Sequence, residues 1–573
     1  MRIKILQTII WVGLGVLGAA LFREQVMQGS YYRELGEKNR VRLIPLEAPR
    51  GRVLDRAGRV LAGNRASYDI MAIPEDMEPE VYFRLSQVLA MPEDELRNRI
   101  HRHREFPFAP ALVQADVGRA MAFRIEEMKP ELPGVFIKVT GLRYYPYREI
   151  ASHLIGYIGK ISRPEYETAD RKRFGMNSWI GRSGIEKSMD DRLRGWRGGR
   201  QIEVDARGRL IRVLSEEEPE PGEDIHLTID LEFQKRISDL LQGKNASVAV
   251  LDLEKEGFLA LASQPSYDPN IFVAPGASAD RMKVLNDTNH PMLDRGTACA
   301  YPPGSVFKLV TAITALELGK ITPHTQFKCG PTFQLRPGTH VFHDWLKTGH
   351  GTIDLYQAIE RSSNVYFYNL SKLLSADDIA RYARILGFGA PMDLELSHVT
   401  PGLVPDRAWK KKKFGQEWFP GDTVSYVIGQ SYLLTSPLQI LRLAAIIAKN
   451  GLFVQPTLVG SSASSTRQAK KVAVSEKTLE TIRKAMLRVV ESDYGTGQLA
   501  RVDFDKMAAK TGTAQVPPKT AHSWMTGFFP YHDPEIAFVA FVEHGGSGGV
   551  TAGKIVKEMV KIYREIYETP LVA

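Results

Sequence analysis

Apolar positions form three kinds of pattern along the chain, and each predicts a different element. Residues 5–22 are apolar and uncharged, and a helix of that length spans about 27 Å. Residues 247–253 and 535–543 are rich in aliphatic and aromatic side chains, as in buried or half-buried strands. The longer stretches 305–318 and 353–374 predict helices between them. This order favours an α+β or α/β unit whose terminal strands join one sheet.

The apolar run at residues 5–22 predicts a single membrane anchor. Arg2 and Lys4 precede it, and a basic leader places the rest of the chain on the outer face of the membrane. The alternative is a cleaved signal peptide, which the small residues near the end of the run would favour. Bulky Trp11 and Phe22 near the ends of this long run favour a retained anchor. No later apolar run is long enough to span.

The polar pattern divides the remaining chain into two blocks. Residues 25–224 are rich in arginine, short strand-like runs and turns, and residues 225–573 are richer in aliphatic runs. The acidic, proline-containing stretch 215–224 predicts a linker between them. We therefore expect a multidomain α+β protein, with an anchor at 1–24 and domains at 25–224 and 225–573.

Composition narrows the class of protein only slightly. The chain has 573 residues, 43% hydrophobic and 25% charged, which is typical of globular domains. Its two cysteines, Cys299 and Cys329, exclude a disulfide scaffold. The net charge of +9 is compatible with several anionic partners. Nucleic acid is not among those we expect, because no dense Lys/Arg stripe is interleaved with aromatic residues.

The first candidate for chemistry is a serine followed by a lysine at helical spacing. Pro302, Pro303 and Gly304 precede Ser305, which places it near the start of a helix with Lys308 on the same face. A serine hydroxyl needs a base, and a lysine becomes one when burial lowers its pKa. An ordinary helix start with a solvated lysine is the alternative, although no other serine in the chain has a lysine at this spacing.

Two further patterns follow in order along the chain. Ser362-Ser363-Asn364 is the only Ser-x-Asn, and it is either a helix cap or a pair of groups for proton transfer and amide binding. Residues 510–513 read Lys-Thr-Gly-Thr and precede a strand-like run, which predicts an edge strand beside a cleft. A second Lys-Thr-Gly at 347–349 lies in a polar stretch and is discounted. Each pattern alone is weak, but the ordered set is the signature of penicillin-binding proteins and serine β-lactamases.

On these motifs the chain resembles a class B penicillin-binding protein, a monofunctional D,D-transpeptidase. Pro49-Arg50-Gly51, Asp55-Arg56 and Gly184-Ile185-Glu186 are similar to the family's pedestal domain. Residues 420–439 and Gly349-His350-Gly351 are most similar to the elongation branch, penicillin-binding protein 2. The resemblance implies a pedestal and a transpeptidase domain whose central antiparallel sheet is flanked by helices.

The resemblance also implies a role for each motif residue. Ser305 would be acylated by the penultimate D-Ala of a stem peptide, with Lys308 as general base. Ser362 would relay the proton, and Asn364 would hold the peptide. The terminal carboxylate would bind the last motif, which consists of Lys510, Thr511, Gly512 and Thr513. Backbone N–H groups of Ser305 and Thr513 would form the oxyanion hole, and a β-lactam would acylate Ser305 durably.

A metal site is a further hypothesis that rests on the resemblance. Some relatives in the elongation branch carry a zinc near the active site, and the matching positions here are Cys329, Asp344, His350 and Ser363. This sequence has Cys329 where an aspartate is expected and Ser363 where a cysteine is expected. Serine is a poor zinc ligand. The alternative is a polar loop over the cleft, and we expect no required cofactor.

Partners and location follow from the same resemblance. They comprise peptidoglycan stem peptides, β-lactams and the polytopic glycosyltransferase of the elongation machinery, at the bacterial cytoplasmic membrane with the catalytic domain facing the periplasm. A division-type transpeptidase, a membrane-anchored serine β-lactamase and a non-enzymatic β-lactam sensor are the alternatives. The block of about 220 residues before the catalytic region and the single apolar segment argue against the last two.

Overall fold

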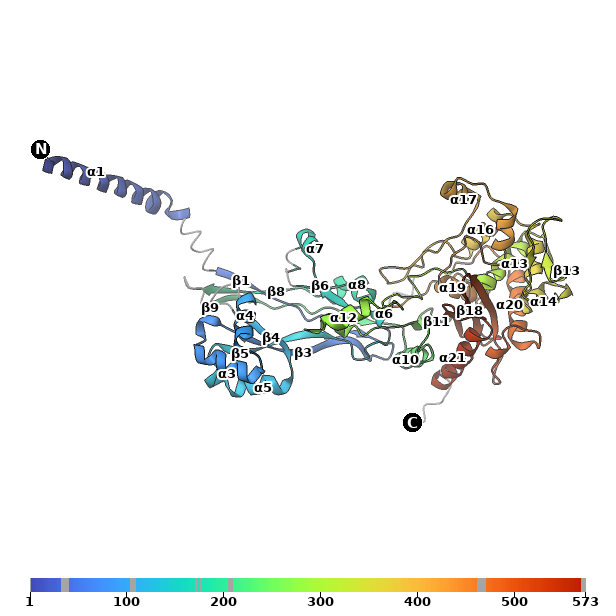
Figure 1. The fold of residues 1–573 in the computed structure, drawn as a ribbon, viewed down its shortest axis with the longest axis horizontal. Helices are drawn as coiled ribbons and strands as arrows, with labels where there is room; N and C mark the ends of the chain where they lie inside the picture. Colours follow the sequence, from blue (N-terminus) through green and yellow to red (C-terminus); the bar gives the residue numbers. More distant parts are fainter. Residues whose placement is uncertain are drawn as a thin grey trace.

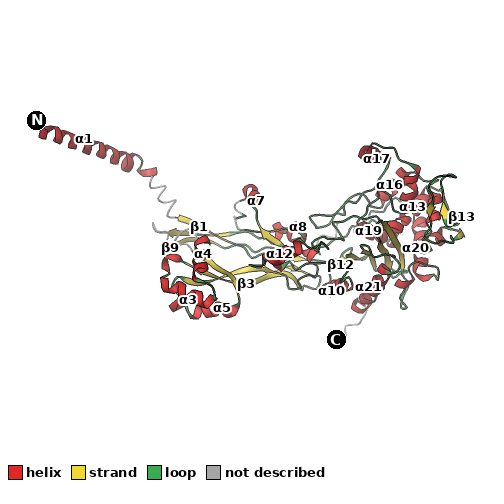
Figure 2. Ribbon diagram, in the orientation of Figure 1, coloured by secondary structure: helices red, strands yellow, loops and turns green. Residues whose placement is uncertain are grey.

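The computed structural model describes residues 2–31, 41–103, 110–170, 173–175, 178–204, 210–460 and 470–567. The molecule is elongated, with a solitary N-terminal helix, a strand-rich pedestal and a C-terminal body of helices around a sheet (Figures 1 and 2). Helix α1 (Arg2–Phe22) continues through one π-helical segment, η1 (Arg23–Met27). Within residues 3–27, an 18-residue apolar window has a mean hydropathy of 2.1, and none of that window is buried. The predicted apolar helix is confirmed, and it is long enough to cross a membrane.

The pedestal is built on two sheets. A three-stranded antiparallel sheet has the order β1–β8–β9, and a five-stranded sheet has the order β10–β2–β3–β4 with β5 also paired to β3. Three helices pack on the long strands and bury a separate apolar cluster that includes Ile70, Leu85 and Ile125. The elements are β1 (Val41–Leu46), β2 (Val53–Leu54), β3 (Val60–Ala72), α3 (Pro79–Leu89), α4 (Glu93–His103), β4 (Ala111–Val117), α5 (Arg119–Glu127), β5 (Val135–Tyr144), β8 (Gly198–Val204), β9 (Leu210–Glu217) and β10 (Ile225–His226).

The predicted linker at residues 215–224 is instead part of the pedestal. Its first residues complete β9, Glu220 pairs with Trp196 through both backbone N–H groups, and Asp224 forms an ion pair with Arg52. The prediction fails because its acidic and proline-rich composition carries no signal of these strand pairings. Strand β10, just beyond the predicted boundary at 224, pairs in parallel with β2, so the chain enters the second domain from within the pedestal sheet.

The C-terminal body contains one five-stranded antiparallel sheet in the order β12–β11–β19–β18–β17. Its first and last strands in sequence lie side by side at its centre, β11 (Ala246–Asp252) against β19 (Ile536–Val542). The other strands are β12 (Phe258–Gln264), β17 (Ala508–Val516) and β18 (Lys519–Phe529). The predicted joining of the terminal strands is confirmed, and so is the α+β class with flanking helices.

Two layers of helices cover this sheet. Alternate residues of β11 and β19 enter two different apolar clusters, as expected for a sheet buried on both faces. One face packs against α10 (Leu231–Leu240) and α21 (Thr551–Tyr567), and the other against α19 (Pro437–Ala448), α13 (Lys308–Glu317) and α20 (Glu476–Glu491). Every residue of α19 is buried.

The stretch 353–374, predicted as one helix, is two. Helix α14 (Leu355–Glu360) ends before Ser362, which has a left-handed backbone with φ +54°, and α15 (Asn364–Leu370) then begins. The Ser363 hydroxyl accepts a hydrogen bond from the Tyr366 N–H and caps α15. The apolar periodicity continues across the break, so the pattern alone predicts no interruption. The break turns Ser362 and Asn364 towards the sheet edge.

The remaining named elements connect these layers. They are α6 (Ser152–Ile155), β6 (Ile158–Lys160), α7 (Arg163–Thr168), β7 (Trp179–Gly181), α8 (Gly184–Ser188), α9 (Asp190–Leu193), α11 (Asn270–Val273), α12 (Ser278–Leu285), β13 (Phe327–Cys329), β14 (Thr332–Phe333), β15 (Phe342–His343), β16 (Gly351–Ile353), α16 (Ala376–Ile385), α17 (Arg407–Phe414) and α18 (Pro420–Tyr426).

Candidate active site

The nucleophile candidate lies on a tight turn packed against the sheet edge. Ser305 is in the 3₁₀ segment η4 (Gly304–Phe307), directly before α13. Gly304 has φ +56°, donates its N–H to Gly429 O at 2.9 Å, and leaves no room for a Cβ atom, which would lie 2.9 Å from Thr513 O. Glycine therefore lets the turn approach β17 closely, and Ser305 faces the cleft beside that strand.

Lys308 begins α13 and is completely buried. Its Nζ donates to Ser362 O at 2.8 Å and to Asn364 Oδ1 at 2.7 Å, and it lies 3.4 Å from Ser362 Oγ. Burial lowers the pKa of Lys308 to about 7, with a smaller opposing effect from Asp344. A lysine with this pKa is partly neutral near neutral pH, as a general base must be.

The hydroxyl of Ser362 lies between two lysines. Lys510 Nζ donates to Ser362 Oγ at 3.0 Å, on the other side from Lys308. Burial and the charge of Lys308 lower the pKa of Lys510 well below its ordinary value. Two ammonium groups beside one hydroxyl are costly, so the pair favours a state with one proton fewer.

The last motif lies on the edge strand, as predicted. The Lys510 side chain extends to Ser362 and donates to its hydroxyl, whereas Thr511 and Thr513 line the cleft. Gly512 packs closely against the turn before Ser305. A Cβ atom at this position would lie only 3.0 Å from Pro303 O, so a larger residue would crowd the turn. The alternative Lys-Thr-Gly at 347–349 lies in an exposed turn outside the cavity lining.

These residues converge on a cavity of about 950 Å³. The motif side chains that line it are Ser305, Ser362, Asn364, Thr511 and Thr513. The sequence motifs do not include several other lining residues, among them His343, Trp345, Gln430, Thr496 and Ser547. Flanking glycines at 495 and 497 are the one sequence signal at Thr496, and they predict only a turn. A nucleophile and several hydroxyl groups line one cavity, and two buried amines lie beside one of those hydroxyls, Ser362. This arrangement suits acyl transfer to a carboxylate-bearing substrate.

Two regions of the chain match known families. Residues 45–227 match the penicillin-binding protein dimerisation domain, and residues 246–561 match the penicillin-binding protein transpeptidase domain. The chain belongs to the penicillin-binding protein transpeptidases. The family resemblance inferred from the three motifs is confirmed.

Relatives of this transpeptidase carry the names peptidoglycan D,D-transpeptidase and penicillin-binding protein 2. The peptidoglycan D,D-transpeptidase MrdA of Escherichia coli is 34% identical, with 93% of this chain and 89% of the relative covered. Its namesake from Haemophilus influenzae is 31% identical over 96% of this chain and 89% of the relative. Penicillin-binding protein 2 of Helicobacter pylori, solved in complex with MreC, has a TM-score of 0.83 at 29% identity, covering 92% of this chain and 99% of that one. The predicted similarity to penicillin-binding protein 2 is confirmed.

The residues predicted as a zinc site of this transpeptidase meet but do not fit a metal. Asp344 Oδ1 lies 3.2 Å from His350 Nε2, and Oδ2 accepts from Ser363 Oγ at 3.0 Å. Although burial raises it, the pKa of Asp344 is lowered to about 2 by the hydrogen bond to His350, by a bond from the Val365 N–H and by the charge of Lys308. Burial raises the pKa of the Cys329 thiol to about 11, and its Sγ donates to Phe327 O at 3.5 Å.

Both carboxylate oxygens of Asp344 thus already have hydrogen-bond partners in the protein, namely His350, Ser363 and the Val365 N–H. In the part of the chain that the structure describes, no group of three or more His, Cys, Asp or Glu side chains is arranged to hold a metal ion. The hypothesis of zinc at Cys329, Asp344 and His350 is therefore not supported. Asp344 instead ties the loop over the cleft to the first turn of α15, through Ser363 and the Val365 N–H.

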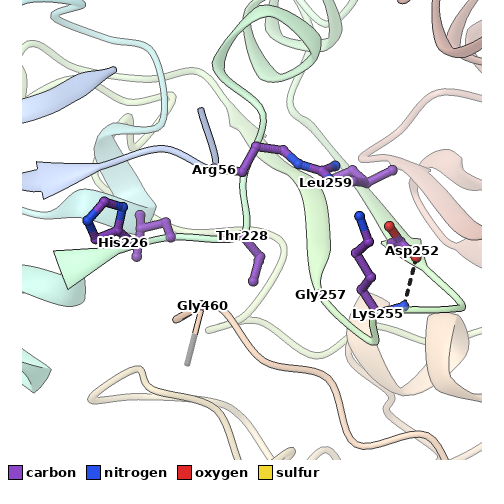
Figure 3. Close-up of a pocket in the computed structure, with 9 residues that line it drawn as sticks. Arg56, His226, Thr228, Asp252, Lys255, Gly257, Leu259 and Gly460 are labelled. Carbon is purple, nitrogen blue, oxygen red and sulfur yellow. Dashed lines mark hydrogen bonds between the residues drawn. The ribbon is translucent and has the colours of Figure 1, made fainter. Parts of the chain in front are cut away.

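A second cavity lies where the pedestal meets the transpeptidase domain (Figure 3). It is smaller, about 250 Å³, and is lined by Arg56, His226, Leu227, Thr228, Asp252, Lys255, Gly257, Leu259 and Gly460. Asp252 accepts the Lys255 N–H at 2.9 Å. No serine and no buried lysine line it, so it lacks the serine–lysine arrangement of the first cavity.

Proposed function

We propose that this chain is a peptidoglycan D,D-transpeptidase that cross-links stem peptides through a Ser305 acyl-enzyme during cell-wall elongation. The observation that carries the proposal is the Ser362 hydroxyl held between Lys308 and Lys510 in the cavity that Ser305 faces. The names of the relatives support the peptidoglycan substrate and the elongation role. The pedestal supports a transpeptidase over a free β-lactamase.

Acylation uses the residues in a defined order. Neutral Lys308 takes the Ser305 proton, and Oγ attacks the carbonyl carbon of the penultimate D-Ala. The N–H groups of Ser305 and Thr513 hold the oxyanion, and each such donor contributes about 3 kcal/mol. Ser362 passes the proton to the nitrogen of the departing D-Ala as its C–N bond breaks. Asn364 holds the peptide, while Lys510, Thr511 and Thr513 bind the terminal carboxylate where Gly512 lets the strand approach.

The second half of the reaction transfers the acyl group. An amine of a neighbouring stem peptide attacks the Ser305 ester, loses a proton to the regenerated base and displaces Oγ. The new amide cross-links two strands. A β-lactam enters by the first half alone, because its ring opens without releasing a leaving group from the site.

Location and partners belong to the same proposal. We place α1 across the cytoplasmic membrane, with the pedestal and catalytic domain on the periplasmic side. The pedestal would meet a polytopic glycosyltransferase, as one solved neighbour belongs to a peptidoglycan synthase complex that couples polymerisation to cross-linking. A partner resembling MreC is proposed from the Helicobacter pylori complex. The domain boundaries at 24 and 224 stay predictions.

The direct experiment is covalent labelling by benzylpenicillin, followed by intact mass. The wild-type chain is expected to gain one penicillin, and Ser305→Ala is expected to gain none. A label on Ser305→Ala would overturn the assignment of the nucleophile. Acyl-enzyme lifetimes of seconds would favour a β-lactamase, and wall complementation by Ser305→Ala would favour a sensor or scaffold.

Metal removal tests the absence of a required cofactor. Dialysis against a chelator is expected to leave the acylation rate unchanged, because each proposed proton transfer uses protein groups alone. A loss of rate that zinc restores would contradict this part of the proposal. Depletion in cells separates elongation from division, since round cells indicate the former and filaments the latter.

A further inference from the structure

Thr496 is the cleft residue that the three motifs leave without a role. It lies between α20 and β17, in the segment Ser492–Gly497, and its side chain lines the cavity with Thr511 and Thr513. Its Oγ1 is 2.7 Å from Thr511 Oγ1, a normal length for a hydroxyl–hydroxyl hydrogen bond. It is therefore in direct contact with a hydroxyl assigned to the substrate carboxylate.

The Thr496 segment is anchored to the turn that carries Ser362. The backbone N–H of Thr496 donates to Glu360 O at 3.2 Å. The buried Glu360 carboxylate accepts from Ser492 Oγ at 2.5 Å and forms an ion pair with Arg488 at 2.7 Å. Both ends of the segment are thus held by one residue two positions before Ser362. The position of Thr496 is set by these contacts and not by its own hydroxyl.

The number of protons available decides which hydroxyl donates in the hydrogen bond between Thr496 and Thr511. Each hydroxyl has one proton, so only one of Thr496 and Thr511 donates in their mutual bond. Without an anion, Thr511 can donate to Thr496, which then donates to Glu360 O at 3.5 Å, the limit of a hydrogen bond. With a carboxylate in the cleft, Thr496 can donate to Thr511 and leave the Thr511 proton for the anion. A carboxylate accepts hydrogen bonds and cannot donate, so its arrival selects the second arrangement.

We propose that Thr496 is a positioning residue for recognition of the substrate's C-terminal carboxylate, which acts by donating its proton to Thr511. The inference deepens the proposed function and rests on it. It assigns to this position a preference for acyl donors that end in a free carboxylate over the same donors with that group esterified. The hydroxyl acts on binding of the donor, while attack by Ser305 is left unchanged.

The test compares benzylpenicillin with its methyl ester, which keeps the ring and loses the anion. Thr496→Val is expected to lower the acylation constant for benzylpenicillin about fivefold to tenfold, the effect of one hydrogen bond. The constant for the ester is expected to stay within twofold. Thr496→Ser should restore the wild-type preference, and the loss should appear in the half-saturating concentration of penicillin and not in the limiting rate.

A double-mutant cycle and a matched control complete the test. In the Thr511→Val background, Thr496→Val is expected to have no further effect, because the shared hydrogen bond is already gone. The control is Thr322→Val, which breaks another threonine pair, Thr322 with Thr325 at 3.2 Å, on the surface. The ratio of acid to ester rates does not depend on the active fraction, so partial misfolding of one variant does not affect it.

The outcomes separate the two proposals. Equal losses for acid and ester, or additive effects with Thr511→Val, would overturn the role of Thr496 and leave the transpeptidase proposal intact. Absence of any wild-type acylation at Ser305 would overturn the transpeptidase proposal itself.

Discussion

The pedestal and the catalytic cleft both bury charged side chains, but in opposite ways. In the pedestal, Glu186 is fully buried between Arg50 and Arg143, with N–O distances of 2.7 Å and 2.6 Å. In the cleft, Lys308 and Lys510 are fully buried, and among the described residues neither forms an ion pair with a carboxylate, although the charge of Asp344 acts on Lys308. The arginines lower the pKa of Glu186, whereas burial lowers the pKa of both lysines.

This difference relates burial to function. Despite burial, the two arginines lower the pKa of Glu186, so the pedestal cluster stays ionised and cross-links β5 and the loop before β2 to α8. Burial without a counter-ion lowers the pKa of Lys308 to about 7, which favours a neutral amine. The buried ion pairs of Glu186 stabilise the pedestal. The buried amine of Lys308, which has no ion-pair partner, is typical of a reactive site.

The largest expected effect is that of Lys308→Met. Removal of a general base lowers a rate by about 10²–10⁴, so we expect the benzylpenicillin acylation constant to fall about 10³-fold. The substitution removes an unpaired buried amine, so the thermal unfolding midpoint is not expected to fall. A variant that retains more than a tenth of the wild-type rate would contradict the role of Lys308.

The second effect compares the two Lys-Thr-Gly sequences. Lys510→Ala removes the buried amine that donates to Ser362 Oγ and that is proposed to bind the carboxylate, and we expect acylation to slow about 10²-fold. Lys347→Ala, in the exposed turn, is the matched control and should stay within twofold of wild type. Similar losses in both variants would show that charge anywhere near the cleft suffices. Rates are measured per molecule competent for labelling.

The smallest effect on chemistry, and the largest on stability, is that of Glu186→Gln. Breaking a buried ion pair on one side costs about 3–5 kcal/mol, and we expect the pedestal transition in urea to move by that amount. Acylation per folded molecule should be unchanged. Because the folded pKa of Glu186 is lowered, its stabilisation is complete above its unfolded pKa of about 4.3 and is lost as pH falls through the folded value. A stability change below about 1 kcal/mol would remove the contrast between the two regions.

Local pattern was sufficient to predict the motif positions and three of the five strands of the catalytic sheet, β11, β17 and β19, but not β12 and β18. The Pro-Pro-Gly turn before Ser305 and the edge strand at Lys510 depend on neighbours in sequence, and both predictions agree with the structure. The break at Ser362 was missed, because apolar periodicity continues from α14 into α15 while the turn is held by contacts from Lys308 and Lys510. Thr496 was missed for the same reason, since its partners Glu360 and Thr511 are distant in sequence. The zinc hypothesis rested on matched positions, and the hydrogen bonds around Asp344 could not be predicted from them.

The central claim is that Lys308 is partly neutral near physiological pH because burial lowers its pKa to about 7. The pH dependence of the benzylpenicillin acylation constant tests it most directly. Protonated Lys308 cannot accept the Ser305 proton, so the constant should rise about tenfold per unit below pH 7 and level off above it. A constant that keeps rising towards the ordinary lysine pKa of about 10.4, or that does not change with pH, would contradict the account.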